Sequence, residues 1–376
     1  MQEDAGQNRH QDVLVAPTKV LPSSSLFLDF CTQLSLALFF MILGVVGSYL
    51  QHGFLIGGRH GVPLAGSHVY VPIRRLLVLG LGAGYITALM GQATGIISLP
   101  YAISVLKFQS LHITPTVQVE TLINPIGALI GYYRQGQRNW DLAMWPSLGA
   151  IFGSNLGPLV RTFWLADNQH FESVLGIVFI FLGTFLCSGV IPFARAGKSR
   201  LEVLRGKFDA HARAQRTSGR LPSGLPEGIT ITTVERGWGH IVVEFWGEQW
   251  KLSVLTMFGV GFATALVAST LGVGGGAILV PLMTQLYQLP MHLLVAASIP
   301  FVITQSAVSL LSYGLVVPHL TGHYASPEWA WGLFVGSAGI VGSWCGAHSQ
   351  RYLPERILKP TLGLIMTGLG IAYIIR

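Results

Sequence analysis

The 376-residue chain is too apolar for a water-soluble protein. Apolar residues make up 51% of it and charged residues only 10%, whereas a globular domain has about 25% charged residues. Its mean hydropathy is +0.55. The composition therefore indicates a polytopic membrane protein, and the 46 glycines suit membrane helices that pack backbone against backbone.

The formal net charge of +7 comes mostly from residues 194–220, which hold eight Lys or Arg residues and two acidic ones. This stretch lacks the interleaved aromatic residues of a base-stacking platform, so no nucleic-acid partner is expected. We interpret the stretch as a signal of membrane topology. Cys31, Cys187 and Cys345 form no CxxC pair, and the chain has no GxxxxGK[ST] motif. No metal, cofactor or nucleotide is therefore expected.

Residues 1–33 form a polar N-terminal segment before the first apolar run, Leu34–Ile56. That run is too long for the core of a secretory signal. We predict a retained extra transmembrane helix at 34–56. The apolar stretches that follow are Leu76–Phe108, His112–Tyr133, Leu142–Leu165, Phe171–Phe193, Leu252–Leu289, His292–Pro318, Trp329–Gln350 and Ile357–Ile375.

Two of these stretches, Leu76–Phe108 and Leu252–Leu289, are too long for one simple helix and short for two, because about 20 residues cross a bilayer. Each carries glycines and a proline in its middle, at Gly91–Pro100 and Gly272–Pro281. A continuous helix would be broken there. We therefore expect both stretches to form broken helical hairpins.

A polar linker at 194–251 separates the two halves of the chain. Residues 229–234 and 240–246 alternate weakly between polar and apolar and predict a small β-hairpin. Trp246 and Trp250, just before the next span, fit an interfacial aromatic belt.

The chain contains an internal duplication. Gly82-Ala-Gly-Tyr-Ile-Thr-Ala-Leu89 and Gly259-Val-Gly-Phe-Ala-Thr-Ala-Leu266 are identical at five of eight positions, and the register continues to the prolines of the two hairpins. We therefore predict a first transmembrane repeat at 76–193 and a second at 252–376.

The distribution of Lys and Arg orients the repeats. The basic linker is expected in the cytoplasm, and the loop 318–328, which has no Lys or Arg, is expected outside. Only His292–Pro318 crosses between them, so Leu252–Leu289 must enter and leave on the same side. Counting back from the linker through three spans makes Leu76–Phe108 a hairpin that enters from the outside. Arg59, Arg74 and Arg75 then lie outside the cell, where Lys and Arg are less common.

These inferences define the predicted fold class. It is an all-α polytopic membrane protein with two inverted repeats, each opening with a broken, re-entrant-like helical hairpin, plus one extra N-terminal transmembrane helix. Inverted repeats with broken helices are typical of secondary transporters. We expect a multi-pass plasma-membrane protein whose N-terminus and linker are cytoplasmic.

The breaks have the chemistry of an anion site. Consecutive glycines leave backbone amides uncovered, and the following helix presents its positive N-terminal end to the same point. The alternative is that the glycines only permit close helix packing. If the hairpins face each other, their tips enclose one pocket. The candidate substrate-binding residues of the tips are Gln92, Thr94, Gly95, Ser98, Ser269, Thr270, Gly274, Gly275 and Gly276.

The segment Gly272-Val-Gly-Gly-Gly-Ala-Ile-Leu-Val-Pro-Leu282, which opens the second half of a duplicated chain, resembles the sulfite exporter TauE/SafE family. The resemblance extends from about Gly80 to the C-terminus. It implies export of small sulfur-containing anions such as sulfite or sulfoacetate.

The helices that follow the hairpins supply further candidates. Thr116, Glu120 and Asn124 share one helical face near the expected midplane. Glu120 is a possible proton carrier, because a carboxyl group at that depth is costly unless it is paired or protonated; the alternative is a structural role. Thr304 aligns with Asn124 and is joined by Gln305, either in the same pocket or in helix packing. No Lys or Arg is expected deep in any span.

The sequence thus predicts a secondary transporter that exports a small anion by alternating access. A channel or an uptake carrier would share the same pocket, so both stay open as alternatives. An integral membrane enzyme is less favoured, because the chain has no HExxH or GxSxG motif. The expected partners are a small anion and the lipid bilayer, and the oligomeric state is left open.

Overall fold

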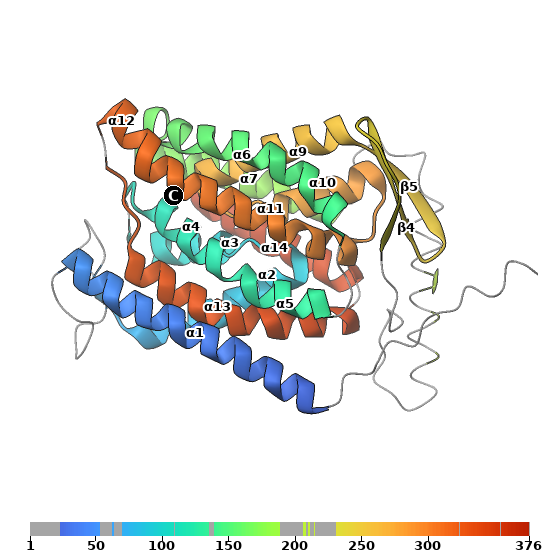
Figure 1. Cartoon of the computed structure of the whole chain (residues 1–376). Coiled ribbons are helices and arrows are strands. Elements are labelled where there is room, and N and C mark those ends of the chain that lie inside the picture. Colours follow the sequence, from blue (N-terminus) through green and yellow to red (C-terminus); the bar gives the residue numbers. More distant parts are fainter. Residues whose placement is uncertain are drawn as a thin grey trace, which may run out of the picture.

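The structure is a computed structural model of the chain. It describes residues 23–52, 62–63, 70–108, 110–134, 139–188, 206–207, 210, 214, 231–322, 324–353 and 355–375. Most of these residues form helices that lie side by side in one bundle (Figure 1). Six of the described helices are long and apolar enough to cross a membrane. The predicted polytopic, mainly helical membrane protein is therefore confirmed.

The described residues of the first half form seven α-helices, one π-helical turn and a short strand pair. They are α1 (Ser23–His52), β1 (Val62–Pro63), β2 (Tyr70–Val71), α2 (Ile73–Met90), α3 (Gly95–Pro100), η1 (Tyr101–Val105), α4 (Ile113–Ile123), α5 (Pro125–Arg134), α6 (Trp140–Phe163) and α7 (Asn168–Ser188).

The second half opens with a three-stranded sheet and continues with helices. The sheet consists of β3 (Thr232–Arg236), β4 (His240–Phe245) and β5 (Glu248–Ser253). The helices are α9 (Val254–Leu271), α10 (Gly276–Tyr287), α11 (Met291–Leu311), η3 (Ser312–Val316), α12 (Val317–Thr321), α13 (Trp329–Ser349), η4 (Gln350–Tyr352) and α14 (Glu355–Ile374).

The boundaries of α1 differ from the expected span of 34–56. The helix begins at Ser23, inside the segment expected to be polar, and ends at His52; residues 53–56 lie outside the described part. The earlier start follows from Leu26, Phe27 and Leu28, which already form an apolar turn. These side chains are exposed on the surface of the bundle, as lipid-facing side chains are.

The linker forms a larger sheet than the predicted hairpin. β3 and β4 pair antiparallel near the expected positions, and β5 adds a third strand. Trp246 and Gly247 both have positive φ, as in a type I′ turn between two strands. Trp250 is buried on β5, so its assignment to an interfacial belt is wrong. The sequence did not predict the third strand, because Trp246-Gly247 is an unusual sequence for the turn that joins β4 to β5.

The sheet lies at one end of the bundle, which we call the linker end (Figure 1). Asn139 Nδ2 donates to Thr233 Oγ1 at 3.0 Å, and Arg236 of β3 pairs with Asp141 at the start of α6. Arg134, at the end of α5, pairs with Asp29 near the start of α1. The start of α6, the end of α5 and the start of α1 therefore lie at the linker end.

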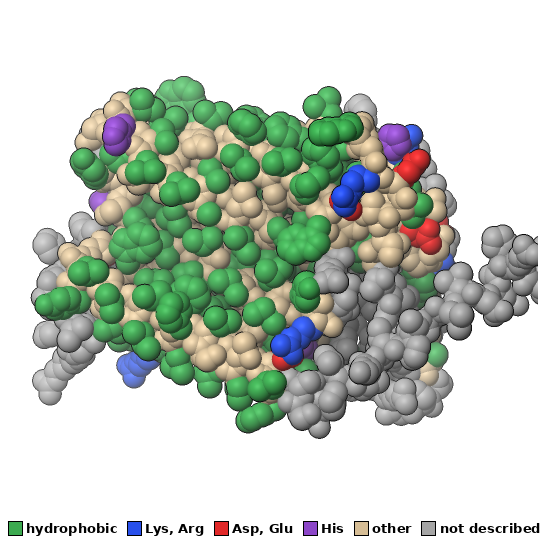
Figure 2. All heavy atoms as spheres, in the orientation of Figure 1, with side chains coloured by type: hydrophobic (Ala, Val, Ile, Leu, Met, Phe, Trp, Pro, Cys, Tyr) green, Lys and Arg blue, Asp and Glu red, His purple; other side chains and the backbone are tan. Residues whose placement is uncertain are grey.

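The opposite end, which we call the far end, carries the loop between α12 and α13. Gln51, near the end of α1, donates from Nε2 to Pro327 O at 3.3 Å, and His112 Nδ1 lies 2.7 Å from Ser326 O. Between the two ends, hydrophobic side chains cover the visible face of the helices, while charged side chains gather mainly around β4 and β5 (Figure 2). This distribution matches a bundle whose sides contact lipid.

Glycines allow three pairs of helices to approach closely. Gly84 of α2 packs against Gly339 of α13, Gly153 of α6 against Phe262 of α9, and Gly183 of α7 against Gly363 of α14. Two glycine pairs, Gly153 with Gly157 on α6 and Gly342 with Gly346 on α13, lie in such close helix contacts.

The two ends of the bundle are expected on opposite sides of the membrane. Trp238 in the sheet and Tyr324 in the far-end loop are 91% and 79% exposed. In a chain whose native cysteines are replaced by alanine, an impermeant maleimide added to intact cells should label Tyr324→Cys, and Trp238→Cys only after permeabilisation. Labelling of both positions from outside would contradict this topology.

Candidate functional site

Both long apolar stretches are interrupted at glycines, as the sequence predicts. α2 ends at Met90 and Gly91 follows with φ +109. α9 ends at Leu271, and Gly272 and Gly274 follow with φ +77 and +86. Such left-handed backbone is readily adopted only by glycine. The chain then turns back into the short helices α3 and α10, so each stretch forms a helical hairpin. We call the turn of the first hairpin, residues 91–95, the first tip, and that of the second hairpin, residues 272–276, the second tip.

The two hairpins start from opposite ends of the bundle. The second begins beside β5, and Tyr287 Oη at its end donates to Ser253 O at its start at 3.3 Å, so both arms reach the linker end. The arm α2 runs parallel to α13, since Gly80 contacts Val335 and Gly346 contacts Tyr85. Because α13 begins at the far end, α2 begins there too.

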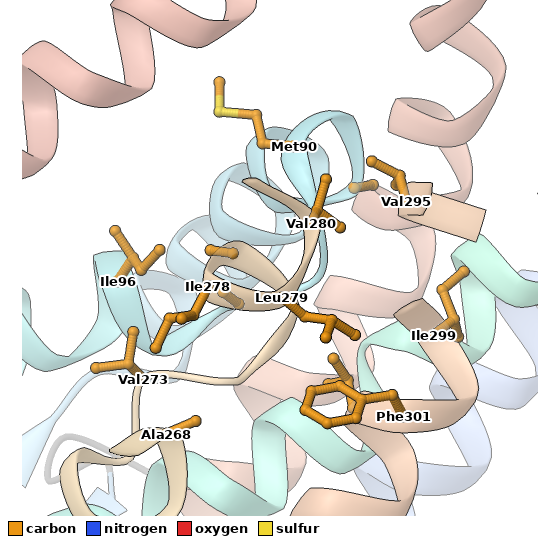
Figure 3. Close-up of a cluster of buried hydrophobic side chains, with 14 of the residues drawn as sticks. Met90, Ile96, Ala268, Val273, Ile278, Leu279, Val280, Val295, Ile299 and Phe301 are labelled. Atoms are coloured by element: carbon orange, nitrogen blue, oxygen red, sulfur yellow. The ribbon is translucent and has the colours of Figure 1, made fainter. Parts of the chain in front are cut away.

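The tips of the two hairpins meet backbone to backbone. A β-carbon on Gly276 would lie 2.5 Å from Gln92 O, one on Gly274 would lie 2.8 Å from Ala93 Cα, and one on Gly95 would lie 2.7 Å from Val273 Cα. Real β-carbons do not approach other atoms so closely, so a side chain at these positions would force the tips apart. Apolar side chains from α2, α3, α9, α10 and α11 surround the contact (Figure 3).

The first tip is bonded to one face of α4. Ser98 Oγ donates to Glu120 Oε2 at 2.9 Å, and Asn124 Nδ2 donates to Thr94 Oγ1 at 2.5 Å. All four side chains are buried. The predicted face of α4 thus meets the predicted polar residues of the first tip.

Several polar atoms at this face have no hydrogen-bond partner among the described residues. They are both side-chain amide atoms of Gln92, Glu120 Oε1 and Asn124 Oδ1. Buried polar groups without partners are rare in stable proteins. No basic side chain in the described part of the chain forms an ion pair with Glu120. These groups are therefore available to a polar ligand or to water.

The second tip is bonded to a different face of α4 through a chain of side-chain amides. The Gly275 N–H donates to Gln305 Oε1 at 3.1 Å. Gln305 Nε2 donates to Gln118 Oε1 at 3.2 Å, and Gln118 Nε2 donates to Ala268 O at 3.5 Å. The sequence analysis missed Gln118, although a buried glutamine two residues before Glu120 in an apolar helix was a usable signal.

Three other predicted residues lie away from these networks. The hydroxyls of Ser269 and Thr270 donate to carbonyls of their own helix, at Ala265 and Leu266, and Thr270 also donates to Gly157 O of α6 at 3.2 Å. Thr304 is half-buried and makes no hydrogen bond within the described part of the chain. In this structure Ser269 and Thr270 serve the contact between α9 and α6.

The expectation that no Lys or Arg lies deep in a span is wrong. Arg161 of α6 is completely buried, as its relative exposure is 0%. It was overlooked because it lies only a few residues from the end of its apolar stretch, where a long side chain ordinarily reaches water.

A sequence profile of the sulfite exporter TauE/SafE family matches residues 18–186 and 76–373. The chain belongs to the sulfite exporter TauE/SafE family. It is also similar to the "Probable membrane transporter protein YunE" of Bacillus subtilis (strain 168), with 23% identity over 300 residues that cover 77% of this chain and 92% of that protein. No solved structure matches it. The chain is thus a TauE/SafE membrane transporter, and the family resemblance inferred from its sequence is confirmed.

The contact between the tips of this TauE/SafE protein makes a stability prediction. Gly95→Ala places a methyl group against the backbone of Gly272 and Val273, and overpacking of this kind costs about 1–3 kcal/mol. The midpoint of thermal unfolding in detergent should fall accordingly. Gly82→Ala, in α2 with no atom within 4 Å, is the matched control and should not lower it. Equal midpoints for both variants would show that the tips are not in contact.

Proposed function

We propose that this TauE/SafE protein is a secondary transporter that exports a small anion, sulfite or an organosulfonate such as sulfoacetate, across the plasma membrane by alternating access. The single observation that carries the proposal is the meeting of two broken hairpins from opposite ends of the bundle. Their tips bring bare backbone and neutral polar side chains to one buried point. The N-terminus and the linker lie in the cytoplasm in this proposal.

The arrangement of the helices supports two inverted repeats, at 76–193 and 252–376. α2 runs parallel to α13 and α6 runs parallel to α9, while α7 and α14 contact each other antiparallel. In two inverted repeats, α2 of the first repeat corresponds to α9 of the second, and α6 corresponds to α13. A twofold rotation that relates the repeats would therefore place the pair α2–α13 on the pair α9–α6. The duplicated sequence agrees, because Gly84 and Gly261 both lie in helix contacts, whereas Gly82 and Gly259 both face open space.

The N–H of Gly275 is the central anion donor in the proposed site. It stands at the N-terminus of α10, where the helix dipole favours negative charge. In this structure a neutral oxygen, Gln305 Oε1, accepts that hydrogen bond. An oxyanion that displaces Gln305 takes up the same bond, and the unpartnered amide of Gln92 supplies a second donor from the other tip.

Neutral donors suit a transported anion better than a full positive charge. They hold it weakly, so it leaves readily. With a negative cytoplasm, the membrane potential favours efflux of each negative charge by about 2.3 kcal/mol per 100 mV. Export in this scheme requires no ATP.

The close packing of the tips favours a carrier over an open channel. The tip residues, the polar side chains bonded to them and the surrounding apolar side chains are buried, and the two backbones are in contact. A solute crosses only if the hairpins separate, first toward one end and then toward the other. This is the structural requirement of alternating access.

Reconstituted flux tests this function. In proteoliposomes, sulfite or sulfoacetate should move with saturable kinetics and counterflow, faster than sulfate or chloride, and an inside-negative potential should speed efflux. Flux that does not saturate would indicate a channel, and no flux of any sulfur-containing anion would refute the proposed substrate.

The substitution Gln305→Glu should reduce flux at least about tenfold, because its carboxylate competes for the Gly275 N–H. Gln305→Met, of similar length and uncharged, is the control and should retain flux.

The role of Glu120 in coupling is tested by its pH dependence. Glu120→Gln preserves an acceptor for Ser98 Oγ but cannot titrate. The substrate for this test is sulfoacetate, because sulfite itself changes its charge near neutral pH. If the carboxyl group of Glu120 carries a proton, sulfoacetate flux by the native protein should change with pH, and flux by the variant should be flat over the same range. Measurement of initial rates from pH 5 to pH 9 at a clamped potential decides the point. Identical profiles for the two proteins would assign Glu120 a purely structural role.

A further inference from the structure

The guanidinium group of Arg161 is buried without a hydrogen-bond partner. Arg161 is 0% exposed, and its Nε, Nη1 and Nη2 atoms all lack an acceptor among the described residues. Its Cζ lies 4.0 Å from the centroid of the Phe171 ring. One face of the guanidinium is therefore covered by an aromatic ring, and its N–H groups have no acceptor among the described residues.

An uncompensated buried guanidinium is costly, because removing a charge from water costs several kcal/mol. Among the described residues, Asp167 is a carboxylate whose charge acts on Arg161. Its carboxylate is 59% exposed and lies 3.2 Å from His170 Nδ1, and it forms no ion pair with Arg161. The cation–π contact recovers only about 2 kcal/mol. The five N–H donors of the Arg161 guanidinium thus have the geometry to bind an oxyanion bidentately.

Tyr313 is one of four residues on α6 and the neighbouring segments whose hydroxyl groups are buried. Tyr313 of η3 lies beside both Arg161 and Thr114, with which its hydroxyl interacts. Ser154 is two turns before Arg161 on the same face of α6, and Ser309 is one turn before Tyr313. The hydroxyls of Ser154 and Ser309 make no hydrogen bond in the described part of the chain. One guanidinium and a neighbouring pair of O–H groups, with no carboxylate ion-paired to the guanidinium among the described residues, form a donor set suited to an oxyanion.

The cluster lies on the far-end side of the second tip. Gly157, one turn before Arg161, contacts the backbone of Thr270, and Thr114 contacts Gly272. Since α6 begins at the linker end and runs toward the far end, Arg161 lies one turn beyond the level of Thr270, beside the second tip and toward the far end. An anion that leaves the tips toward the far end meets this cluster next.

We propose that Arg161, together with Tyr313 and Thr114, forms a second anion site on the far-end side of the hairpin tips, which binds the small oxyanion before its release outside. The site's place on a path rests on the proposed export function, whereas its capacity to bind an oxyanion does not. Arg161 supplies the bidentate fork, and the hydroxyls of Tyr313 and Thr114 supply further donors.

Binding is tested first without transport. In purified full-length protein carrying Gln305→Glu, which blocks the tips, sulfite should raise the midpoint of thermal unfolding in a saturable manner, because a ligand of the folded state stabilises it. Adding Arg161→Met should abolish this rise, and adding Arg236→Met, an exposed arginine of the linker sheet, should not. A rise that persists in the Arg161→Met variant overturns the proposal. If this stabilisation depends on Arg161 but the native protein shows no flux of sulfur-containing anions in proteoliposomes, the export function alone is refuted.

Flux then tests the position of the site. Arg161→Met should raise the half-saturating concentration of sulfite at the far-end side at least about tenfold, the value of a lost charged hydrogen bond, and change the value at the linker side less than twofold. A purely structural role would lower the maximal rate without this asymmetry. Where Arg161→Met fails to fold, Tyr313→Phe, which removes only the hydroxyl, should raise the far-end value about fivefold. An unchanged far-end value in the folded variant overturns the assignment.

Discussion

The contact between the two glycine tips is the constraint on which the rest of the structure depends. At each break some backbone groups bond back to their own helix, and the others need a partner because a membrane interior offers no water. The protein packs Gly276 against Gln92 and Gly95 against Val273, which excludes solvent, and it bonds the Gly275 N–H to Gln305. The absence of β-carbons allows the tips to approach, and it leaves an amide whose acceptor in this structure is a neutral side chain.

Helix α4 joins the two hairpins because different faces of it bond different tips. One face carries Glu120 and Asn124, which bond the first tip, and another carries Gln118, which reaches the second tip through Gln305. Any movement that separates the tips must therefore break hydrogen bonds on at least one face of α4. In the proposed alternating-access cycle, an intact buried network on one face of α4 would stabilise the closed arrangement on that side while the network on the other face opens.

Charge is distributed unevenly around the tips. The tips themselves offer neutral donors from Gly275 and Gln92, whereas beside the second tip, toward the far end, Arg161 carries a full positive charge stacked on Phe171. A guanidinium attracts an anion more strongly than amides do, so in the proposed transport path an anion would be held more tightly on the far-end side of the tips. The direction of net transport is set by the concentration gradient and the membrane potential.

The membrane environment, the two helix breaks and the face of α4 that carries Glu120 and Asn124 could all be predicted from sequence patterns. They follow from composition, from glycine and proline chemistry and from the 3.6-residue period of a helix. Four other features became visible only in the folded protein: Gln305 accepts from Gly275, Gln118 extends this network, Ser269 and Thr270 face α6, and Arg161 is buried. Such outcomes depend on how helices distant in the sequence cross one another, and a local pattern contains no information on which neighbour a side chain meets.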